Sequence, residues 1–514
     1  MSSAELSASG PSHKPPPAPL RRRPRRTRRL LAVVIPLVLL VLVTVPWGIS
    51  RLVDTSSAAA PAGDAGAAEG GSEGANGVGD PYFPTYGSGG YDALKYAISV
   101  SWDAANEELT GTTVATARAT QPLSSFYLDL ALATRAVRVN DRPATFSRSG
   151  RSDLKITPAQ PIAAGTMFRV AVDYSGKPGR VKGVSAWWSS KQEWTIAGEP
   201  ESSTLWFPAN DHPSDPALMD VSIRVPAGMT AVSVGRLESK DSASEAEFDT
   251  WHWVAAQPVA SYLNFMAIGS YDLRQGTADG RPYVYAVSSQ LPSADRSRAF
   301  AALARTAPIL RTLETMFGPY PFTEIGGVVP AAALPFGGLE TQTRPVYSAA
   351  DLLDDAGSRY LIAHELAHMW YGDNVTLKHW NDIFTNEAYA SWAAWGYAER
   401  TGGKSADAIM LAAYERLKGE AGFWKITMID PGRDHLFDAV YQRGPMTLQA
   451  LRNVIGDPAF FSLAREWGQQ PGSRSLEEWM ATAQSKTEVD LKPFFQAWIY
   501  SPTAPARTAA NGLR

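Results

Sequence analysis

The spacing of apolar residues divides the chain into two parts that predict different secondary structure. In the first part, apolar and polar residues alternate in short runs such as Ala97–Trp102 and Phe168–Val172. Turn residues separate these runs, as in Val139–Asp141 and Val225–Gly228. Alternation with a period of two, interrupted by turns, is typical of strands in an antiparallel sheet. We therefore predict an N-terminal antiparallel β domain over residues 81–290.

The second part has the spacing of helices. Apolar residues recur at helical intervals from Ser293 to Met316, and Ser293 is a suitable N-cap, so the pattern predicts one long amphipathic helix. Further helical stretches follow to about residue 499. Strands followed by helices predict an α+β protein, with the β domain packed on a mostly helical domain over residues 291–502. Residues 503–514 are expected to form a frayed tail.

An uncharged apolar run of 20 residues, Leu30–Ile49, lies near the N-terminus. A helix of this length spans roughly 30 Å, the thickness of the hydrocarbon core of a membrane. Residues 21–29 hold seven arginines, and such basic flanks stay in the cytoplasm. We therefore predict a cytoplasmic tail over 1–29, a transmembrane helix over 30–49 and an extracytoplasmic remainder. A cleaved signal peptide is the alternative, because Ser56–Ala60 is rich in small residues.

Composition adds three constraints. Residues 50–80 are rich in alanine, glycine and serine and predict a flexible linker. The chain has no cysteine, which excludes disulfides and attachment of a lipid through cysteine. The first 29 residues carry a net charge of +7, which leaves −10 for the rest because the whole chain carries −3. Nucleic acid is therefore not an expected partner of the folded part.

The segment His364-Glu365-Leu366-Ala367-His368 carries the most specific chemistry. Histidines four apart lie on one face of a helix and can bind one ion, while Glu365 faces a water on that ion. Glu387 follows after 18 residues and is a candidate third ligand. Three ligands and one open position are typical of catalytic zinc, which lowers the pKa of bound water to roughly 7. Glu365 would take the proton of that water as it attacks a carbonyl.

The alternative for this segment is a buried helix with two hydrogen-bonded histidines. The chain has only 7 histidines, so two at metal-binding spacing favour the metal site.

The segments HELAH and WNDIFTNEAYA together resemble the M1 family of zinc aminopeptidases, whose motif is HExxH, 18 residues and then E. Phe336–Gln342 resembles the exopeptidase motif GxMEN of the family, and Tyr441–Gly444 resembles its downstream tyrosine segment. Glu199–Asp211 resembles a segment of its N-terminal domain. The similarity runs from about Tyr82 to about Ser501. It implies a thermolysin-like catalytic domain with one Zn²⁺ per chain, bound by His364, His368 and Glu387.

The resemblance also implies roles for residues outside the zinc motif. Tyr441 would donate a hydrogen bond to the developing oxyanion. Glu340 would bind the free α-amine of the substrate, and Gly337 and Gly338 would let the backbone approach the peptide. Thr341 stands where relatives usually have asparagine, which removes an amide from the motif.

Two further assignments had alternatives. Glu199 occupies the position of a second contact to the substrate amine, but Glu201 is only two residues away. Asp382 and Asn386 are candidates to hold the zinc-binding histidines from behind, and a helix N-cap is an equally good role for Asp382.

Together these observations predict a membrane-anchored zinc aminopeptidase that removes N-terminal residues from peptides with a free N-terminus, outside the cytoplasm. One alternative is an endopeptidase, or a hydrolase of non-peptide substrates, on the same scaffold. Another is a non-catalytic binding protein with the same fold. Larger members of the family continue with a β-sandwich and a large helical domain, so a short form lacking both is expected.

Overall fold

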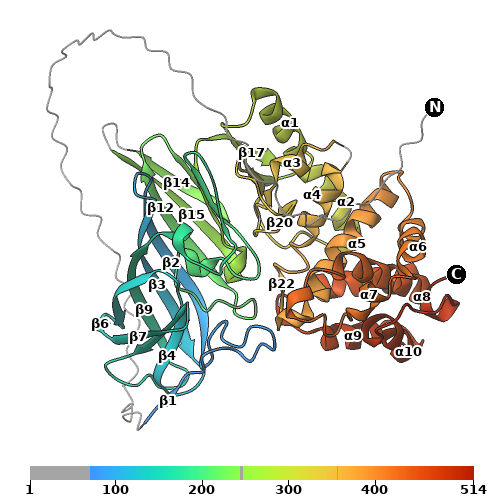
Figure 1. Ribbon diagram of the computed structural model, residues 1–514, viewed down its shortest axis with the longest axis horizontal. Helices are drawn as coiled ribbons and strands as arrows, with labels where there is room; N and C mark the ends of the chain where they lie inside the picture. Colours follow the sequence, from blue (N-terminus) through green and yellow to red (C-terminus); the bar gives the residue numbers. More distant parts are fainter. Residues whose placement is uncertain (1–69, 243–246, 356) are drawn as a thin grey trace, which may run out of the picture. The chain divides into compact units, whose positions relative to one another are not determined.

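The computed structural model describes residues 70–242, 247–355 and 357–514. The predicted cytoplasmic tail, the predicted transmembrane helix over 30–49 and the linker up to residue 69 lie outside the described residues. Among the residues that are described, no helix combines the length and the apolar character needed to cross a membrane. Strands of the N-terminal part, blue to green in Figure 1, precede the helices of the C-terminal part, yellow-green to red.

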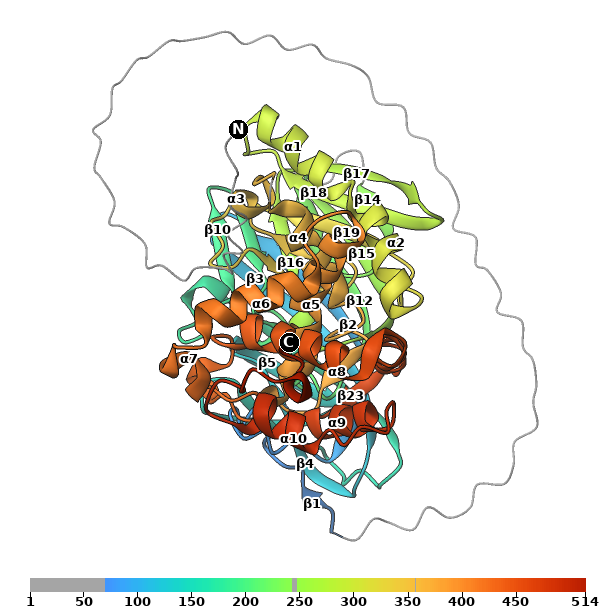
Figure 2. The same ribbon diagram turned by 90° about the vertical axis from the view of Figure 1, so that its right-hand side faces the viewer.

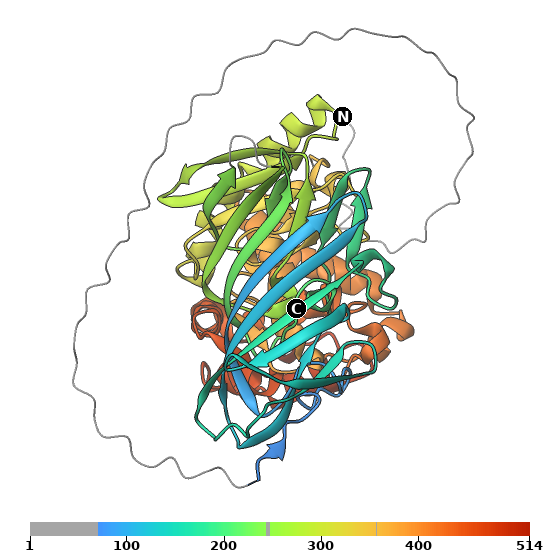
Figure 3. The same ribbon diagram turned by 90° about the vertical axis from the view of Figure 1, so that its left-hand side faces the viewer.

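The N-terminal part is built on an eight-stranded sheet, whose strands cross the view in Figure 3. Its strands, in spatial order, are β14 (Arg236–Ser242), β15 (Phe248–Val259), β12 (Ala217–Pro226), β2 (Tyr91–Asp103), β3 (Glu108–Ala119), β9 (Met167–Gly176), β5 (Ala133–Val139) and β6 (Arg142–Pro143). In β12, alternate residues such as Met219, Val221 and Ile223 are buried, as the period of two predicted. The β-rich N-terminal part of the predicted fold is confirmed.

The predicted antiparallel sheet is a mixed one. Each neighbouring pair is antiparallel except β2 and β12, which run parallel, with Ile98 opposite Val221. A tight hairpin forces consecutive strands to be antiparallel, as Asn140 and Asp141 do between β5 and β6, where both have positive φ. No hairpin links β2 to β12, so the alternation of residues contains no information on their relative direction.

Two four-stranded sheets complete the N-terminal part. One contains β1 (Ser72–Glu73), β4 (Leu123–Asp129), β8 (Asp153–Thr157) and β7 (Thr145–Ser149). The other contains β10 (Trp187–Ser190), β11 (Glu193–Ile196), β16 (Met266–Gly269) and β13 (Thr230–Val232).

The last residues of the predicted linker are part of the fold. Glu73 accepts a hydrogen bond from Lys155 Nζ at 2.6 Å. Asp80 is buried and accepts hydrogen bonds from the backbone N–H of Trp380 at 2.7 Å and from His212 Nε2 at 3.1 Å. These partners are distant in sequence, so the local composition contains no sign of them. It therefore predicted a flexible linker, although tertiary contacts hold these residues in place.

A five-stranded sheet spans the domain boundary predicted at residue 290. It contains β17 (Tyr271–Ala278), β18 (Arg281–Ser288), β19 (Ile325–Val329), β21 (Val346–Tyr347) and β20 (Gly338–Leu339). The first two strands therefore share a sheet with strands of the C-terminal part, although their pattern resembles that of the preceding strands. A two-stranded sheet of β22 (Val375–Leu377) and β23 (Gly472–Arg474) lies further along the chain.

Ten helices cover this part of the described chain, and Figure 2 shows them from the side on which the C-terminal helices lie in front. They are α1 (Ser293–Leu303), α2 (Thr306–Phe317), α3 (Ala349–Leu352), α4 (Ser358–Ala367), α5 (Phe384–Arg400), α6 (Ala406–Leu417), α7 (Ala421–Lys425), α8 (Val440–Gly468), α9 (Leu476–Gln484) and α10 (Lys492–Phe495). The prediction of a mostly helical second part is confirmed.

The single helix predicted over 293–316 is two helices, α1 and α2. Pro308 has no N–H to donate to Ala304, and its ring would collide with that carbonyl in a continuous helix. The chain therefore starts a new helix at Thr306. Ser293 is the first residue of α1, and within the described part of the chain its side chain makes no capping hydrogen bond.

The predicted frayed tail is packed against the helices. Leu513 is buried, and Asn453 Nδ2 on α8 donates a hydrogen bond to the carbonyl of Gly512 at 2.9 Å. Trp498 Nε1 donates to the carbonyl of Asn511 at 3.0 Å. Leu513 is the single large apolar side chain of residues 503–514, which gave too weak a pattern to predict this docking.

Candidate metal centre and active site

Helices α4 and α5 bring the three candidate ligands together. His364 lies on α4, His368 ends it, and Glu387 lies in the first turn of α5. The two Nε2 atoms are 3.2 Å apart, and Glu387 Oε2 lies 3.3 Å from His364 Nε2 and 3.5 Å from His368 Nε2. Burial lowers the pKa of His364 to about 4, so its imidazole is neutral at neutral pH, as a metal ligand must be.

The triangle of donor atoms fits zinc. Ligands at 2.0–2.1 Å from a tetrahedral zinc are separated by about 3.3–3.4 Å, which is close to the three sides observed. Glu387 Oε2 is buried and has no hydrogen-bond partner among the described residues. A buried carboxylate oxygen without a donor is costly unless a cation faces it. Two imidazoles and one carboxylate are a donor set that zinc accepts.

Asn386 holds the candidate ligand His368 on the side away from the other candidate ligands. Its Nδ1 lies 2.5 Å from Asn386 Oδ1 and 3.1 Å from the carbonyl of Tyr371, so Nε2 is the atom that faces the other ligands. Gly372 makes this possible, because a Cβ there would collide with Asn386 Oδ1. This contact agrees with the role expected for Asn386.

Asp382 was the other candidate to hold a zinc-binding histidine, and its hydrogen bonds go to other residues. Its carboxylate accepts hydrogen bonds from the backbone N–H groups of His379 at 2.9 Å and Leu476 at 2.8 Å, so it caps one helical turn and joins it to the start of α9. Asp382 is not the N-cap expected as its alternative role: His379 is the N-cap of this turn, and Asp382 is its third residue, whose side chain accepts from the N-cap backbone.

Glu365 is buried on α4, one residue after His364. A Cβ at Gly338 would collide with its carboxylate, so the candidate base lies directly against the exopeptidase-like segment. Burial raises the pKa of Glu365 well above its ordinary value, and the charges of Glu340 and Glu387 add to this rise. Gly337 precedes this contact, and its carbonyl accepts the backbone N–H of Ser348 at 2.8 Å.

Tyr441 lies in the first turn of α8 and faces the ligands. Its hydroxyl donates to Glu387 Oε1 at 3.1 Å, and its ring lies 6.0 Å from that of His364. Arg443, two residues later, is fully buried and fixes this turn. Its guanidinium donates to the backbone carbonyls of Trp424, Ile426, Trp498 and Ser501.

Glu340 follows β20 and is buried next to the candidate base. Oxygen atoms of Glu340 and Glu365 and a ring nitrogen of His368 all lie within 4.8 Å of one another. The hydroxyl of Thr341 donates to the carbonyl of Arg344 at 2.8 Å, which closes the turn after Glu340. Threonine at the position of the usual asparagine therefore stabilises this loop internally.

Glu199, and not Glu201, belongs to this group of carboxylates. Burial raises the pKa of Glu199 well above its ordinary value, and the charges of Glu340, Glu387 and Glu365 contribute next. Glu201 instead accepts hydrogen bonds from Arg151 Nη2 at 2.5 Å and from the Tyr86 and Thr204 hydroxyls at 2.6 Å.

Two further residues, Asp373 and Tyr262, lie at the site and were not predicted from the sequence. Asp373 follows the turn after α4 and is buried, and neither carboxylate oxygen has a partner within the part of the chain that the structure describes. Burial raises its pKa, and Glu340 and Glu365 raise it further. Tyr262 comes from the β domain and donates to Glu340 Oε1 at 3.1 Å. Asp373 follows closely after the HELAH segment, and this position could have indicated that it belongs to the site. No local sequence pattern indicates the same for Tyr262.

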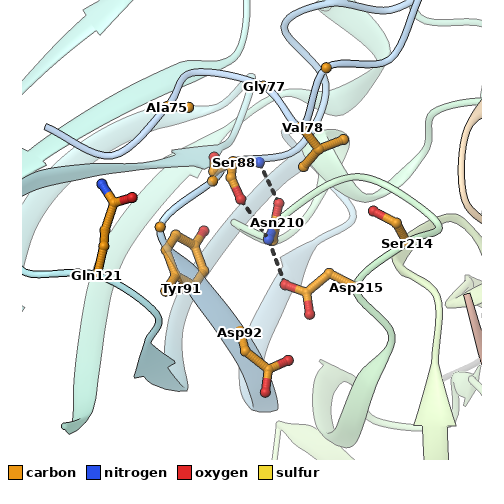
Figure 4. Close-up of a pocket in the computed structure, with 13 residues that line it drawn as sticks. Ala75, Gly77, Val78, Ser88, Tyr91, Asp92, Gln121, Asn210, Ser214 and Asp215 are labelled. Carbon is orange, nitrogen blue, oxygen red and sulfur yellow. Dashed lines mark hydrogen bonds between the residues drawn. The ribbon is translucent and has the colours of Figure 1, made fainter. Parts of the chain in front are cut away.

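A separate hollow of about 570 Å³ lies in the β domain and is lined by none of the predicted site residues (Figure 4). Asn210 Nδ2 donates to Asp215 Oδ2 at 2.5 Å, and the backbone N–H of Ala93 donates to the same oxygen at 3.1 Å. Burial raises the pKa of Asp215 to about 7, and the nearby Asp92 adds to the rise.

The raised pKa of Asp215 predicts a pH-dependent stability. Its folded-state value lies above the ordinary value of 3.8, so its contribution to stability is full below that value and is lost as pH rises through about 7. We expect Asp215→Asn, which carries no charge, to raise Tm at about pH 8 and by much less at about pH 5. Calorimetry at both pH values checks this, with the exposed Asp241→Asn as control. An equal shift of Tm at both pH values would contradict it.

Comparison with known proteins identifies the family that this site resembles. Residues 301–498 match the peptidase family M1 domain. Aminopeptidase B of Mus musculus is 26% identical over 335 residues, which are 61% of this chain and 49% of that protein. Endoplasmic reticulum aminopeptidase 1 of Homo sapiens is 27% identical over 316 residues, which are 55% of this chain and 32% of that protein. The chain thus spans at most about half the length of these curated relatives.

A solved structure is similar over nearly its whole length. A mutant of an M1 zinc metallopeptidase from Deinococcus radiodurans, bound to a Tyr-Ser-Ala substrate, superposes with a TM-score of 0.75 and 25% identity. The match covers 84% of this chain and 98% of that one. The matched domain, these relatives and this solved structure together support an M1 aminopeptidase-like protein.

Proposed function

We propose that this protein is a zinc aminopeptidase that releases the N-terminal residue of peptides. Zinc would be held, one ion per chain, by His364, His368 and Glu387. When bound, it supplies a Lewis acid and lowers the pKa of water. Glu365 would accept the proton of the attacking water and return it to the departing amine. Tyr441 would donate its hydroxyl proton in a hydrogen bond to the oxyanion as it develops.

The observation that carries this proposal is the short distance from Glu340 to the candidate base. Oxygens of both carboxylates lie within 4.8 Å of one another and of His368. Within one amino acid, the nitrogen and the carbonyl carbon are only about 2.5 Å apart. An ammonium group bound to Glu340 therefore brings the carbonyl of the same residue to Glu365, and the first peptide bond is the one cleaved.

The remaining carboxylates agree with a cationic ligand. Glu199 Oε1 is buried without a hydrogen-bond partner among residues 70–242, 247–355 and 357–514, and it lies close enough to Glu340 for their charges to repel. An ammonium group would satisfy both carboxylates. Gly337 and Gly338 would leave room for the peptide backbone beside Glu365.

The test compares aminoacyl-arylamides that have a free or an acetylated N-terminus. We expect hydrolysis of the free form alone, its loss after treatment with a chelator, and its recovery when zinc is added. Equal hydrolysis of the acetylated form would replace the aminopeptidase proposal with an endopeptidase. Activity unaffected by the chelator would exclude the zinc mechanism.

We further propose that Leu30–Ile49 anchors the protein in a membrane, with the catalytic part outside the cytoplasm. The support is the sequence itself, an uncharged apolar run that follows seven arginines. Expression of the full chain, followed by membrane fractionation and protease treatment of intact cells, tests this topology. A full-length protein that stays in the soluble fraction would contradict it.

A further inference from the structure

We propose that Tyr262 is a positioning residue of the amine site, which fixes the carboxylate of Glu340 for the substrate ammonium. This inference rests on the proposed aminopeptidase function. It assigns to the β domain a part in orienting the carboxylate that would bind the substrate N-terminus.

Tyr262 lies in a short turn, Ser261–Leu263, that connects the two segments carrying the amine-binding candidates. On one side, Ser202 Oγ, three residues after Glu199, donates to the carbonyl of Tyr262 at 3.2 Å. On the other side, the backbone N–H of Gln342, two residues after Glu340, donates to the carbonyl of Leu263 at 3.3 Å. The turn therefore fixes the separation of Glu199 and Glu340.

Packing around the Tyr262 ring fixes the position of its hydroxyl. The residue is 1% exposed, and its ring packs edge-on against Trp380 with centroids 5.3 Å apart. In this position the hydroxyl lies 3.1 Å from Glu340 Oε1. The ring contributes packing, and the hydroxyl contributes a hydrogen bond. Replacement by phenylalanine therefore removes the hydrogen bond and keeps the packing.

The Tyr262 hydroxyl keeps its proton and donates a hydrogen bond to Glu340, one of several carboxylates at the site. Burial raises the pKa of Tyr262 well above its ordinary value, and Glu340, Glu199 and Asp373 raise it further, so it stays protonated. A phenol has one proton to donate, and Glu340 receives it. Glu199 Oε1 and both oxygens of Asp373 are without partners in the described part of the protein. They remain available to the three N–H donors of an ammonium group.

The predicted consequence is a defect in binding. Without the hydroxyl, the Glu340 carboxylate can rotate, and the ammonium group must be bound by a less ordered acceptor. Glu365 and Tyr441 do not contact this hydroxyl in the structure, so the chemical step should change less than substrate binding. Loss of a hydrogen bond to a charged group is expected to raise KM by about tenfold.

The experiment compares Tyr262→Phe with Tyr414→Phe, whose hydroxyl donates to the carbonyl of Pro505 at 2.6 Å and not to a candidate site residue. Both variants are assayed on an aminoacyl-arylamide, and both are also combined with Glu340→Gln. We expect KM to rise about tenfold in Tyr262→Phe and to stay unchanged in Tyr414→Phe. In the Glu340→Gln background, Tyr262→Phe should lower kcat/KM no further, because the charged acceptor is already gone.

Two results would overturn this inference. One is a KM of Tyr262→Phe equal to that of the unmodified protein. The other is a loss of kcat/KM on Tyr262→Phe that is equal with and without Glu340→Gln. Tyr262 would then contribute to the stability of the fold and not to the position of Glu340. The unmodified protein distinguishes a failure of the inference from a failure of the proposed function. If it hydrolyses acetylated and free substrates equally, the aminopeptidase function is wrong, whatever Tyr262→Phe does.

Discussion

Replacement of Glu365 by glutamine is expected to lower kcat by about 10³-fold while zinc remains bound. Glutamine has the same shape, so it fits the tight space against Gly338. It has no basic oxygen that can accept the proton of the attacking water. The candidate ligand atoms of His364, His368 and Glu387 are left unchanged. The loss should therefore appear in kcat, with KM within about threefold of its original value.

The control for this variant is Glu415→Gln, which removes a carboxylate from the exposed surface of α6, where it pairs with Lys418. We expect full activity from it. Zinc content, measured on the same samples by elemental analysis, separates loss of the base from loss of the metal. If Glu365→Gln retained more than about a tenth of the original kcat with zinc bound, Glu365 would not be the base.

The candidate metal ligands could be proposed from the sequence because their geometry is local. Histidines four apart on a helix share a face in any protein, so His364 and His368 needed no tertiary information. Glu387 lies on a separate helix, and its place 18 residues later followed from the resemblance to the M1 family. The structure brings these residues to 3.2–3.5 Å from one another.

Residues whose role depends on tertiary contacts could not be predicted in this way. Tyr262 lies 78 residues before Glu340 in a turn without a recognisable pattern, and only the packing of the β domain brings them together. Asp80 was assigned to a linker because its neighbours are alanine and glycine, yet it connects His212 and Trp380. In each case the partner is distant in sequence, and composition or periodicity contains no information about it.

Errors in the predicted fold have a similar origin, with one exception. The parallel pairing of β2 and β12 arises from a long connection, and strand patterns do not show direction. The break between α1 and α2 is different, because Pro308 is visible in the sequence. A proline inside a helical pattern is a reason to expect a break or a kink there.

Replacement of Tyr441 by phenylalanine is expected to lower kcat by about 10²-fold to 10³-fold, with little change in KM. The ring packs beside His364 and stacks on Phe437, and phenylalanine keeps both contacts. Only the hydroxyl is lost, and with it the donor that would stabilise the oxyanion. This donor matters more in the transition state than in the bound substrate, since negative charge develops there.

The same hydroxyl also donates to Glu387 Oε1 at 3.1 Å, so its removal has a second possible consequence. If the phenol acts mainly by holding the ligand, Tyr441→Phe should bind zinc more weakly, and excess zinc should restore kcat. If it acts on the oxyanion, zinc content should equal that of the unmodified protein, and excess zinc should restore nothing. Tyr414→Phe, a buried tyrosine on α6, controls for the loss of a phenol elsewhere. We expect the second result, because Arg443 fixes this turn of α8 through four backbone carbonyls whether or not the hydroxyl is present.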